Sequence, residues 1–213
     1  MALRLGDLAP DFTAASTDGD LHFHEWKHDR WAVLFSHPAD FTPVCTTELG
    51  RTAALKDGFA SRNCLVAALS VDTVEDHHRW APDIGAIGGT ELNFPIIADP
   101  DGTIASSYDM IHPGEGDMST VRSVFIIGPD HRIKMTMTYP KSTGRNFDEI
   151  LRVLDSLQLT ASHALATPVD WKPGDRVIVP PTMSTEEAEQ TFADVEEIRP
   201  YLRYATDPSH TSS

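Results

Sequence analysis

A strand–helix–strand unit near the N-terminus is the feature that most constrains the fold of this chain. Two apolar runs, Trp31–Ser36 and Leu65–Val71, each have the length of a buried strand. Between them, the residues from Pro43 to about Ala60 place apolar side chains at helical spacing. Two strands joined through a helix run parallel with a right-handed crossover, and the faces of their sheet must be covered by further helices.

The chain continues this mixture of strands and helices up to residue 159. The patterns predict helices at residues 73–81, 101–108 and 145–159, and strands at residues 94–98, 121–128 and 133–139. The last two strands are joined by Gly128-Pro129-Asp130, which is typical of an antiparallel hairpin. We therefore expect an α/β fold with a central mixed sheet flanked by helices, in which the loops after the parallel strands carry the functional site.

Cys45 follows the first of these strands and lies at the start of the predicted helix. Thr42 followed by a proline is typical of an N-cap followed by the first helical residue. Cys45 is then the third helical residue, where free backbone N–H groups and the helix dipole favour an anion, so we expect a thiolate. One helix end contributes only about 0.3–1 kcal/mol. A cation must therefore fold back onto the sulfur, and the candidates are His37, Arg122 and Arg145.

The charge balance excludes some classes of partner. The chain has 17 basic and 32 acidic residues, a net charge of −15 at pH 7, which argues against nucleic acid or an anionic membrane as partner. No apolar run is long enough to span a bilayer, and residues 1–7 lack the apolar core of a signal peptide. Two cysteines are too few for a disulfide framework, so we expect a cytoplasmic protein without membrane insertion.

The composition changes after Leu159. Four prolines punctuate an extended stretch, which is followed by the acidic segment Glu186–Glu197 and a polar tail. We expect a main domain at residues 1–165, a C-terminal arm at residues 166–205 and a disordered tail at residues 206–213. The arm is too small to be expected to form its own core, so it should pack on the main domain or on a second subunit.

The sequence carries the motif Pro38-x-x-x-Thr42-x-x-Cys45 and longer characteristic blocks at residues 41–50, 144–152 and 167–172. In these blocks, and up to about Tyr204, the chain resembles the one-cysteine peroxiredoxins of the peroxiredoxin-6 branch. The resemblance implies a thioredoxin-like fold and the thiol-dependent reduction of hydrogen peroxide and organic hydroperoxides, in the service of antioxidant defence. The reaction would pass through a cysteine sulfenic acid, and it would need no metal or organic cofactor.

The resemblance also implies roles for individual residues. Cys45 matches the peroxidatic cysteine, and Thr42 matches the residue whose hydroxyl contacts the thiolate and the peroxide. Arg122 matches the arginine that stabilises the thiolate and polarises the peroxide, and Pro38 matches the proline that shields the thiolate from water. Two further residues match positions just behind this group: His37 and Arg145.

Cys64 is expected to be a small core residue, because it enters the second predicted strand. A resolving cysteine in two-cysteine relatives lies towards the C-terminus, and no cysteine follows Cys64 here. We therefore expect an external thiol to reduce the sulfenic acid. The resemblance further implies a homodimer with the C-terminal arm across it, and it leaves open a higher ring oligomer and a holdase role.

A zinc hydrolase is one alternative interpretation. His24, Glu25 and His28 match the H-E-x-x-H pattern of zinc metalloproteases. That pattern needs a helix of several turns, whereas a strand is predicted to begin at Trp31. We interpret the match as accidental.

A phospholipase activity is a second alternative, because some members of this branch hydrolyse lipids through a serine, a histidine and an aspartate. His24 and Asp130 match the histidine and the aspartate. Arg30 stands at the position of the serine, and an arginine cannot act as an acyl nucleophile. The sequence therefore argues against this activity.

Overall fold

The computed structural model describes residues 3–210. The chain divides into two compact units, Met1–Phe147 and Asp148–Ser213, and each is described by itself. Within the described residues, the first unit contains a seven-stranded sheet and the second a three-stranded sheet.

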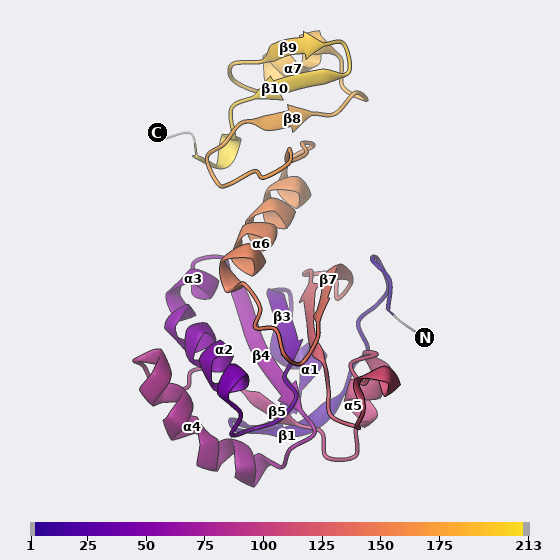
Figure 1. The fold of residues 1–213 in the computed structure, drawn as a ribbon. Coiled ribbons are helices and arrows are strands. Elements are labelled where there is room, and N and C mark those ends of the chain that lie inside the picture. The colour runs from indigo at the N-terminus through magenta and orange to yellow at the C-terminus, as the bar shows by residue number, and fades with distance from the viewer. Residues whose placement is uncertain (1–2, 211–213) are drawn as a thin grey trace. The chain divides into compact units, whose positions relative to one another are not determined.

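The sheet of the first unit is mixed, as predicted (Figure 1). Its central strands β3, β4 and β5 run parallel to one another, and β6 and β7 continue the sheet in antiparallel fashion. An unpredicted hairpin of β1 and β2 extends the other edge, where β1 pairs with β5. The strands are β1 Thr13–Ser16, β2 Gly19–His22, β3 Trp31–Ser36, β4 Cys64–Ser70, β5 Ile96–Ala98, β6 Arg122–Ile127 and β7 Ile133–Tyr139.

The helices predicted for this unit lie close to their expected positions, with two differences, and a further helical turn at Phe23–Lys27 was not predicted. The segment predicted as one helix is divided into α2 (Pro43–Ala54) and α3 (Lys56–Ala60), because Leu55 leaves the helical region at φ −93° and ψ 13°. Helix α4 (Val74–Gly88) extends beyond the predicted end at residue 81. Pro82 does not end it, because Trp80 and Ile84 continue its buried face. The remaining helices are the single turns α1 (Phe23–Lys27) and α5 (Thr103–Ser107) and the 3-10 turn η1 (Pro113–Glu115).

Strand β3 and helix α2 together bring Cys45 to its position. Every residue of β3 is buried, so the strand has no solvent-facing side. Helix α2 crosses over the sheet beside α4, as Figure 1 shows, and the two backbones meet at Gly50 and Gly88. A Cβ atom on Gly88 would lie 2.5 Å from the carbonyl oxygen of Gly50, so this close approach requires glycine.

The second unit has its own apolar core, which differs from the expectation that the arm would lack one. Its core gathers side chains from α6 and from the segments that follow it, around the buried ring of Trp171. The elements are α6 Phe147–Ser162, β8 Val177–Val179, α7 Thr185–Thr191, β9 Glu196–Arg199 and β10 Leu202–Ala205, followed by the 3-10 turn η2 Pro208–His210. Helix α6 therefore belongs with the arm, because Leu159 near its end packs in the same core as Trp171.

The segment predicted as a disordered tail is only partly described. Residues 206–210 have defined structure, because the carboxylate of Asp207 is buried and accepts hydrogen bonds from the backbone N–H groups of Gly174 and Ser209. Residues 211–213 of the predicted tail lie outside the described residues.

Candidate active site

Cys45 lies in the first turn of α2, as the sequence predicts. Thr42 is the N-cap in an extended conformation, with φ −109° and ψ 146°, and Pro43 is the first helical residue. The hydroxyl of Thr42 donates to the carbonyl of Ala39 at 2.8 Å rather than capping the helix. The thiol of Cys45 is fully buried, so the electrostatic effect of neighbouring charges on it is only weakly screened by water.

Arg122 is the cation that reaches the sulfur. Its Nη1 lies 3.4 Å from the Sγ of Cys45, although the two residues are 77 positions apart in the sequence. Strand β6 carries Arg122 beside β3, and both side chains are buried. The Nε and Nη2 atoms donate to the carbonyl of Lys141 at 2.9 and 2.7 Å, so the guanidinium is held in one orientation.

Glu48 joins this site, and the sequence reasoning missed it. It lies one turn after Cys45 on the buried side of α2, and its Oε2 accepts from Nη1 of Arg122 at 2.7 Å. Arg145 donates to the same carboxylate from its backbone N–H, its Nε and its Nη2, at 2.7, 2.9 and 2.7 Å. Burial alone would raise the pKa of Glu48, but the hydrogen bonds and charge of Arg145 hold it below the ordinary value. An acidic side chain on the inner face of a helix was the available signal, because such a charge requires a partner.

The charges of this cluster favour an anionic sulfur. Arg122, Arg145 and the ionised Glu48 are all buried, and together they carry one net positive charge. A buried net charge is costly, and a thiolate at Cys45 would neutralise it. The structure thus brings Arg122 into contact with the Cys45 sulfur, whereas Arg145 makes its hydrogen bonds to Glu48 and acts on Cys45 through its charge alone.

His37 and Pro38 lie in the loop between β3 and α2, and both are buried. The backbone of His37 is held on both sides. Its N–H donates to the carbonyl of Leu69 in β4 at 3.0 Å, and its carbonyl accepts from the hydroxyl of Thr120, which lies before β6, at 2.7 Å. The His37 ring faces Asp40, with Nε2 2.8 Å from Oδ1. Within the described residues, the His37 ring makes no hydrogen bond to Cys45, so any effect on the sulfur is indirect in this structure.

Comparison with known protein families and curated proteins identifies the chain. It matches the AhpC/TSA family over residues 5–136 and the C-terminal domain of 1-Cys peroxiredoxin over residues 156–194. It is 52% identical to Peroxiredoxin-6 of Rattus norvegicus, with 97% of this chain and 98% of that protein covered. The chain belongs to the one-cysteine peroxiredoxins. It is also 49% identical to the 1-Cys peroxiredoxin of Dictyostelium discoideum, with 97% and 86% covered.

Solved structures agree with this assignment. A cysteine-to-serine mutant of the peroxiredoxin 6 of Arenicola marina matches with a TM-score of 0.92 and 47% identity, covering 97% of this chain and 99% of that one. A yeast mitochondrial 1-Cys peroxiredoxin matches with a TM-score of 0.90 and 45% identity, covering 96% and 99%. The predicted thioredoxin-like fold is confirmed, and this peroxiredoxin is a thiol peroxidase.

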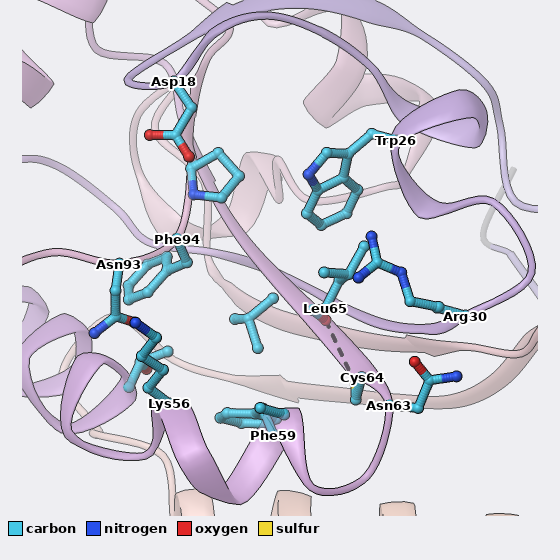
Figure 2. Close-up of a pocket in the computed structure, with 14 residues that line it drawn as sticks. Asp18, Trp26, Arg30, Lys56, Phe59, Asn63, Cys64, Leu65, Asn93 and Phe94 are labelled. Atoms are coloured by element: carbon cyan, nitrogen blue, oxygen red, sulfur yellow. Dashed lines mark hydrogen bonds between the residues drawn. The ribbon is translucent and has the colours of Figure 1, made fainter.

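Cys64 lies in a pocket of its own. The pocket has a volume of about 350 Å³, and Cys45 is not among the residues that line it. Figure 2 shows Cys64 on the wall of this pocket, between Asn63 and Leu65. Its thiol donates a hydrogen bond to the Leu65 carbonyl, with sulfur and oxygen 3.4 Å apart. Burial raises the pKa of the Cys64 thiol to about 12, so it is a neutral core residue in this peroxiredoxin.

The three residues at the phospholipase positions make contacts with other residues rather than with one another. Nε2 of His24 lies 2.9 Å from the carbonyl of Ala9, and Asp130 pairs with Lys134 at 2.7 Å. Arg30 lines the pocket of Cys64, where Figure 2 shows it beside Asn63. The polar contacts of the His24 side chain in the described residues are with Asp11 and the carbonyl of Ala9, and neither offers a hydroxyl or thiol nucleophile.

The zinc alternative fails on helix length. Helix α1 is a single turn that ends at Lys27, and His28 follows it with φ 49°, in the left-handed region. Within residues 3–210, the one group with metal-ligand spacing is His37, Asp40 and Asp72. The carboxylates of this group already accept hydrogen bonds from protein donors, and they do not form an open set of ligands.

The helices of this chain are short or amphipathic rather than uniformly apolar. Within residues 3–210, no helix combines the length and the hydropathy that a bilayer crossing requires.

Proposed function

We propose that Cys45 is the peroxidatic nucleophile of this thiol peroxidase and that Arg122 and Thr42 bind the peroxide beside it. The observation that carries the proposal is the 3.4 Å approach of the Arg122 guanidinium to the Cys45 sulfur at the start of α2. A helix N-terminus and a fixed guanidinium both stabilise an anion, first on the sulfur and then on the leaving oxygen of the peroxide.

The reaction follows from this arrangement. The thiolate attacks the terminal oxygen of the hydroperoxide, an S–O bond forms and the O–O bond breaks. The leaving oxygen takes the electron pair and a proton from water, which yields an alcohol or water and the sulfenic acid of Cys45. Arg122 stabilises the charge that grows on the leaving oxygen. Thr42 has its own hydrogen directed at Ala39, so its oxygen is free to accept the O–H on the leaving oxygen of hydrogen peroxide.

The loop at residues 37–42 controls the access of peroxide to the Cys45 sulfur and shields the sulfur from water. Cys45 is fully buried, so a peroxide reaches the sulfur only when this loop moves. Pro38 is buried in the loop and excludes water from the thiolate when the loop is closed. Phe41 has φ 55° in the same loop, a conformation that costs energy for a bulky residue and is retained next to functional groups.

An external thiol is proposed as the reductant of the sulfenic acid. Cys64 is neutral and lines a separate pocket, so it is poorly placed to form a disulfide with Cys45. The thiol-resolving mechanism of the yeast mitochondrial relative runs via glutathione/thioredoxin systems, which supports a reductant of the same chemical class here. We further propose a cytoplasmic homodimer in which residues 166–205 contribute to the interface; sedimentation of the full chain should show a dimer, and a monomer at micromolar concentration would refute it.

The test of the function compares the two cysteines. The Cys45→Ser variant should consume no peroxide in the presence of a thiol reductant, whereas Cys64→Ser should match the wild type. Trapping of sulfenic acid with a dimedone-type reagent, followed by mass spectrometry, should label Cys45 after one equivalent of hydrogen peroxide. Peroxide consumption by Cys45→Ser, or an internal disulfide in the oxidised wild type, would overturn the proposal.

A further inference from the structure

A buried chain of hydrogen bonds links the loop before α2 to helix α4. Asp40 in the loop lies between two histidines, with Oδ1 2.8 Å from Nε2 of His37 and Oδ2 2.6 Å from Nδ1 of His77. The side chains of both histidines have no exposed surface, and that of Asp40 is 1% exposed. His37 was a candidate from the sequence, whereas no sequence pattern indicated Asp40 or His77.

The partners of His77 determine where its hydrogens are. Its Nδ1 faces the carboxylate of Asp40, and its Nε2 lies 3.3 Å from the backbone carbonyl of Ile97. Carboxylate and carbonyl oxygens only accept hydrogen bonds, so these two contacts call for a hydrogen on each ring nitrogen of His77, and the positive charge of such a ring lowers the pKa of His37. Burial would raise the pKa of Asp40, but its hydrogen bonds with His37 and His77 hold it below the ordinary value, which keeps this carboxylate ionised.

The same reasoning assigns the hydrogen of His37. Its Nε2 faces Asp40 and therefore donates, whereas its Nδ1 is buried and has no hydrogen-bond partner among the described residues. Burial lowers the pKa of His37 despite the opposing effect of Asp40, so the ring is neutral and Nδ1 is an acceptor. Buried polar atoms almost always have a partner, and an acceptor left open in the loop that precedes the catalytic helix points to a ligand that brings an O–H group.

We propose that Asp40 and His77 are positioning residues of the peroxidase, which hold His37 in the tautomer whose Nδ1 accepts a hydrogen bond from the O–H of the bound hydroperoxide. The proposal rests on the function assigned to Cys45. His37 takes up no proton: the hydrogen stays on the attacked oxygen and becomes that of the sulfenic acid. The contact orients the oxygen that the thiolate attacks.

The charge of His77 is essential to this arrangement. The titratable groups that face His37 are Asp40, His77 and Asp72. The Oδ2 of Asp72 accepts from the backbone N–H of Asp40 at 3.0 Å and from the hydroxyl of Ser70 at 2.7 Å, and its charge acts on His37 in the same direction as that of Asp40. Without the positive charge of His77, the full charge of Asp40 would act on His37 and draw a second proton onto it. Nδ1 would then be a donor and could no longer accept the peroxide hydrogen.

The first test observes the hydrogens directly. Nitrogen-15 NMR of the reduced, full-length protein with labelled histidine should show His37 neutral with its hydrogen on Nε2, and His77 with hydrogens on both nitrogens, at pH 7. A hydrogen on Nδ1 of His37, or a neutral His77, would overturn the proposal. This readout needs no turnover, so its failure is distinguishable from a failure of the function assigned to Cys45.

The second test uses the pH dependence of Cys45 oxidation by hydrogen peroxide, followed by stopped flow. His77→Leu removes the donor and the charge, and His77→Asn keeps a donor near the Nδ1 position without the charge. In both variants the acid limb of the rate profile should move to higher pH by about one unit or more, with more of the maximal rate retained in His77→Asn. The exposed neighbour His78 supplies the control, and His78→Asn should keep the wild-type profile.

The outcomes separate positioning from mere support of the fold. A lower rate with an unchanged acid limb in His77→Asn means a structural role only and refutes the proposal. If His77→Leu does not fold, His77→Asn and the NMR assignment still decide. Peroxide consumption by the Cys45→Ser variant would instead remove the function on which the inference rests.

Discussion

Arg145 binds both carboxylate oxygens of Glu48, with Nε 2.9 Å from Oε1 and Nη2 2.7 Å from Oε2. This bidentate ion pair compensates most of the charge of Glu48, which lies one turn from Cys45 on the same helix. The Nη1 atom of Arg122 contacts both Oε2 of Glu48 and the sulfur of Cys45. The pair therefore leaves most of the charge of Arg122 available to the thiolate.

Replacement of Arg122 should slow the oxidation of Cys45. Arg122→Gln removes the charge beside the sulfur, so less thiolate forms and the leaving oxygen loses a donor, with an expected loss of about 10²–10³-fold in rate. Stopped-flow measurement with hydrogen peroxide on the reduced protein tests this. Arg132→Gln is the control, because that guanidinium binds the carbonyl of Gly6 in the exposed N-terminal segment. A rate within about twofold of the wild type for Arg122→Gln would contradict the assignment.

Replacement of Glu48 should destabilise the fold. Glu48→Gln leaves Arg122 and Arg145 buried without a counter-ion, which costs about 3–5 kcal/mol in the free energy of unfolding. Urea denaturation measures this quantity. The control is Glu149→Gln, which removes a partly exposed pair with Arg152 and should cost at most about 1 kcal/mol. An equal decrease in the free energy of unfolding in the two variants would show that the buried ion pairs of Glu48 contribute no more to stability than the partly exposed pair.

The same carboxylate predicts the acid sensitivity of the protein. The pKa of Glu48 is lower in the folded chain than its ordinary value of 4.5, so its contribution to stability is present above pH 4.5 and is lost as the pH falls through the lower, folded value. The free energy of unfolding of the wild type should decrease in that acid range, and Glu48→Gln should show a shallower decrease. Parallel pH profiles for the two proteins would exclude Glu48 as a source of the effect.

The thiol of Cys64 should resist alkylation in the folded protein. Because burial raises the pKa of Cys64 to about 12, this thiol should stay unreactive towards iodoacetamide in the native Cys45→Ser variant up to about pH 11. Denaturation in guanidinium should restore the ordinary reactivity. Rapid native labelling of Cys64 at pH 8, read by mass spectrometry, is the result that this prediction forbids.

The contact between α2 and α4 should not tolerate a side chain at Gly88. Gly88→Ala places a Cβ 2.5 Å from the carbonyl oxygen of Gly50, so the two backbones must separate, at an expected cost of about 1–3 kcal/mol. Gly114→Ala is the matched control, because no atom lies within 4 Å of its added Cβ. Thermal unfolding of both variants tests the prediction, and a Gly88→Ala variant as stable as Gly114→Ala would contradict it.

Local sequence patterns were sufficient for the elements around the catalytic residue. The apolar run of β3 and the Thr42–Pro43 start of α2 involve only neighbouring residues, and both lie where they were predicted. The sequence also implied that Cys45 needed a cation, since a helix end alone stabilises a thiolate only weakly. It could not choose among His37, Arg122 and Arg145 without the family resemblance, because that choice depends on distance in space.

The C-terminal segment shows where local reasoning failed. Its strands are three or four residues long and are separated by prolines, so no periodicity marks them. The pairing of these strands, and the core that β8 and β10 form around Trp171 with the end of α6, become visible only when the segment is folded. A short strand is stabilised by its neighbours rather than by its own residues.

Residue order was enough to predict the sheet with its crossover helix, the position of Cys45 at a helix start and the lack of a second cysteine towards the C-terminus. The three-dimensional arrangement was needed to show which charges surround the sulfur and which nitrogen of His37 lies against Asp40. Glu48 lies 97 positions from Arg145, and Asp40 lies 37 positions from His77. A buried charge or ring nitrogen has its properties set by the atoms within hydrogen-bonding distance, and the order of residues along the chain does not encode that distance locally.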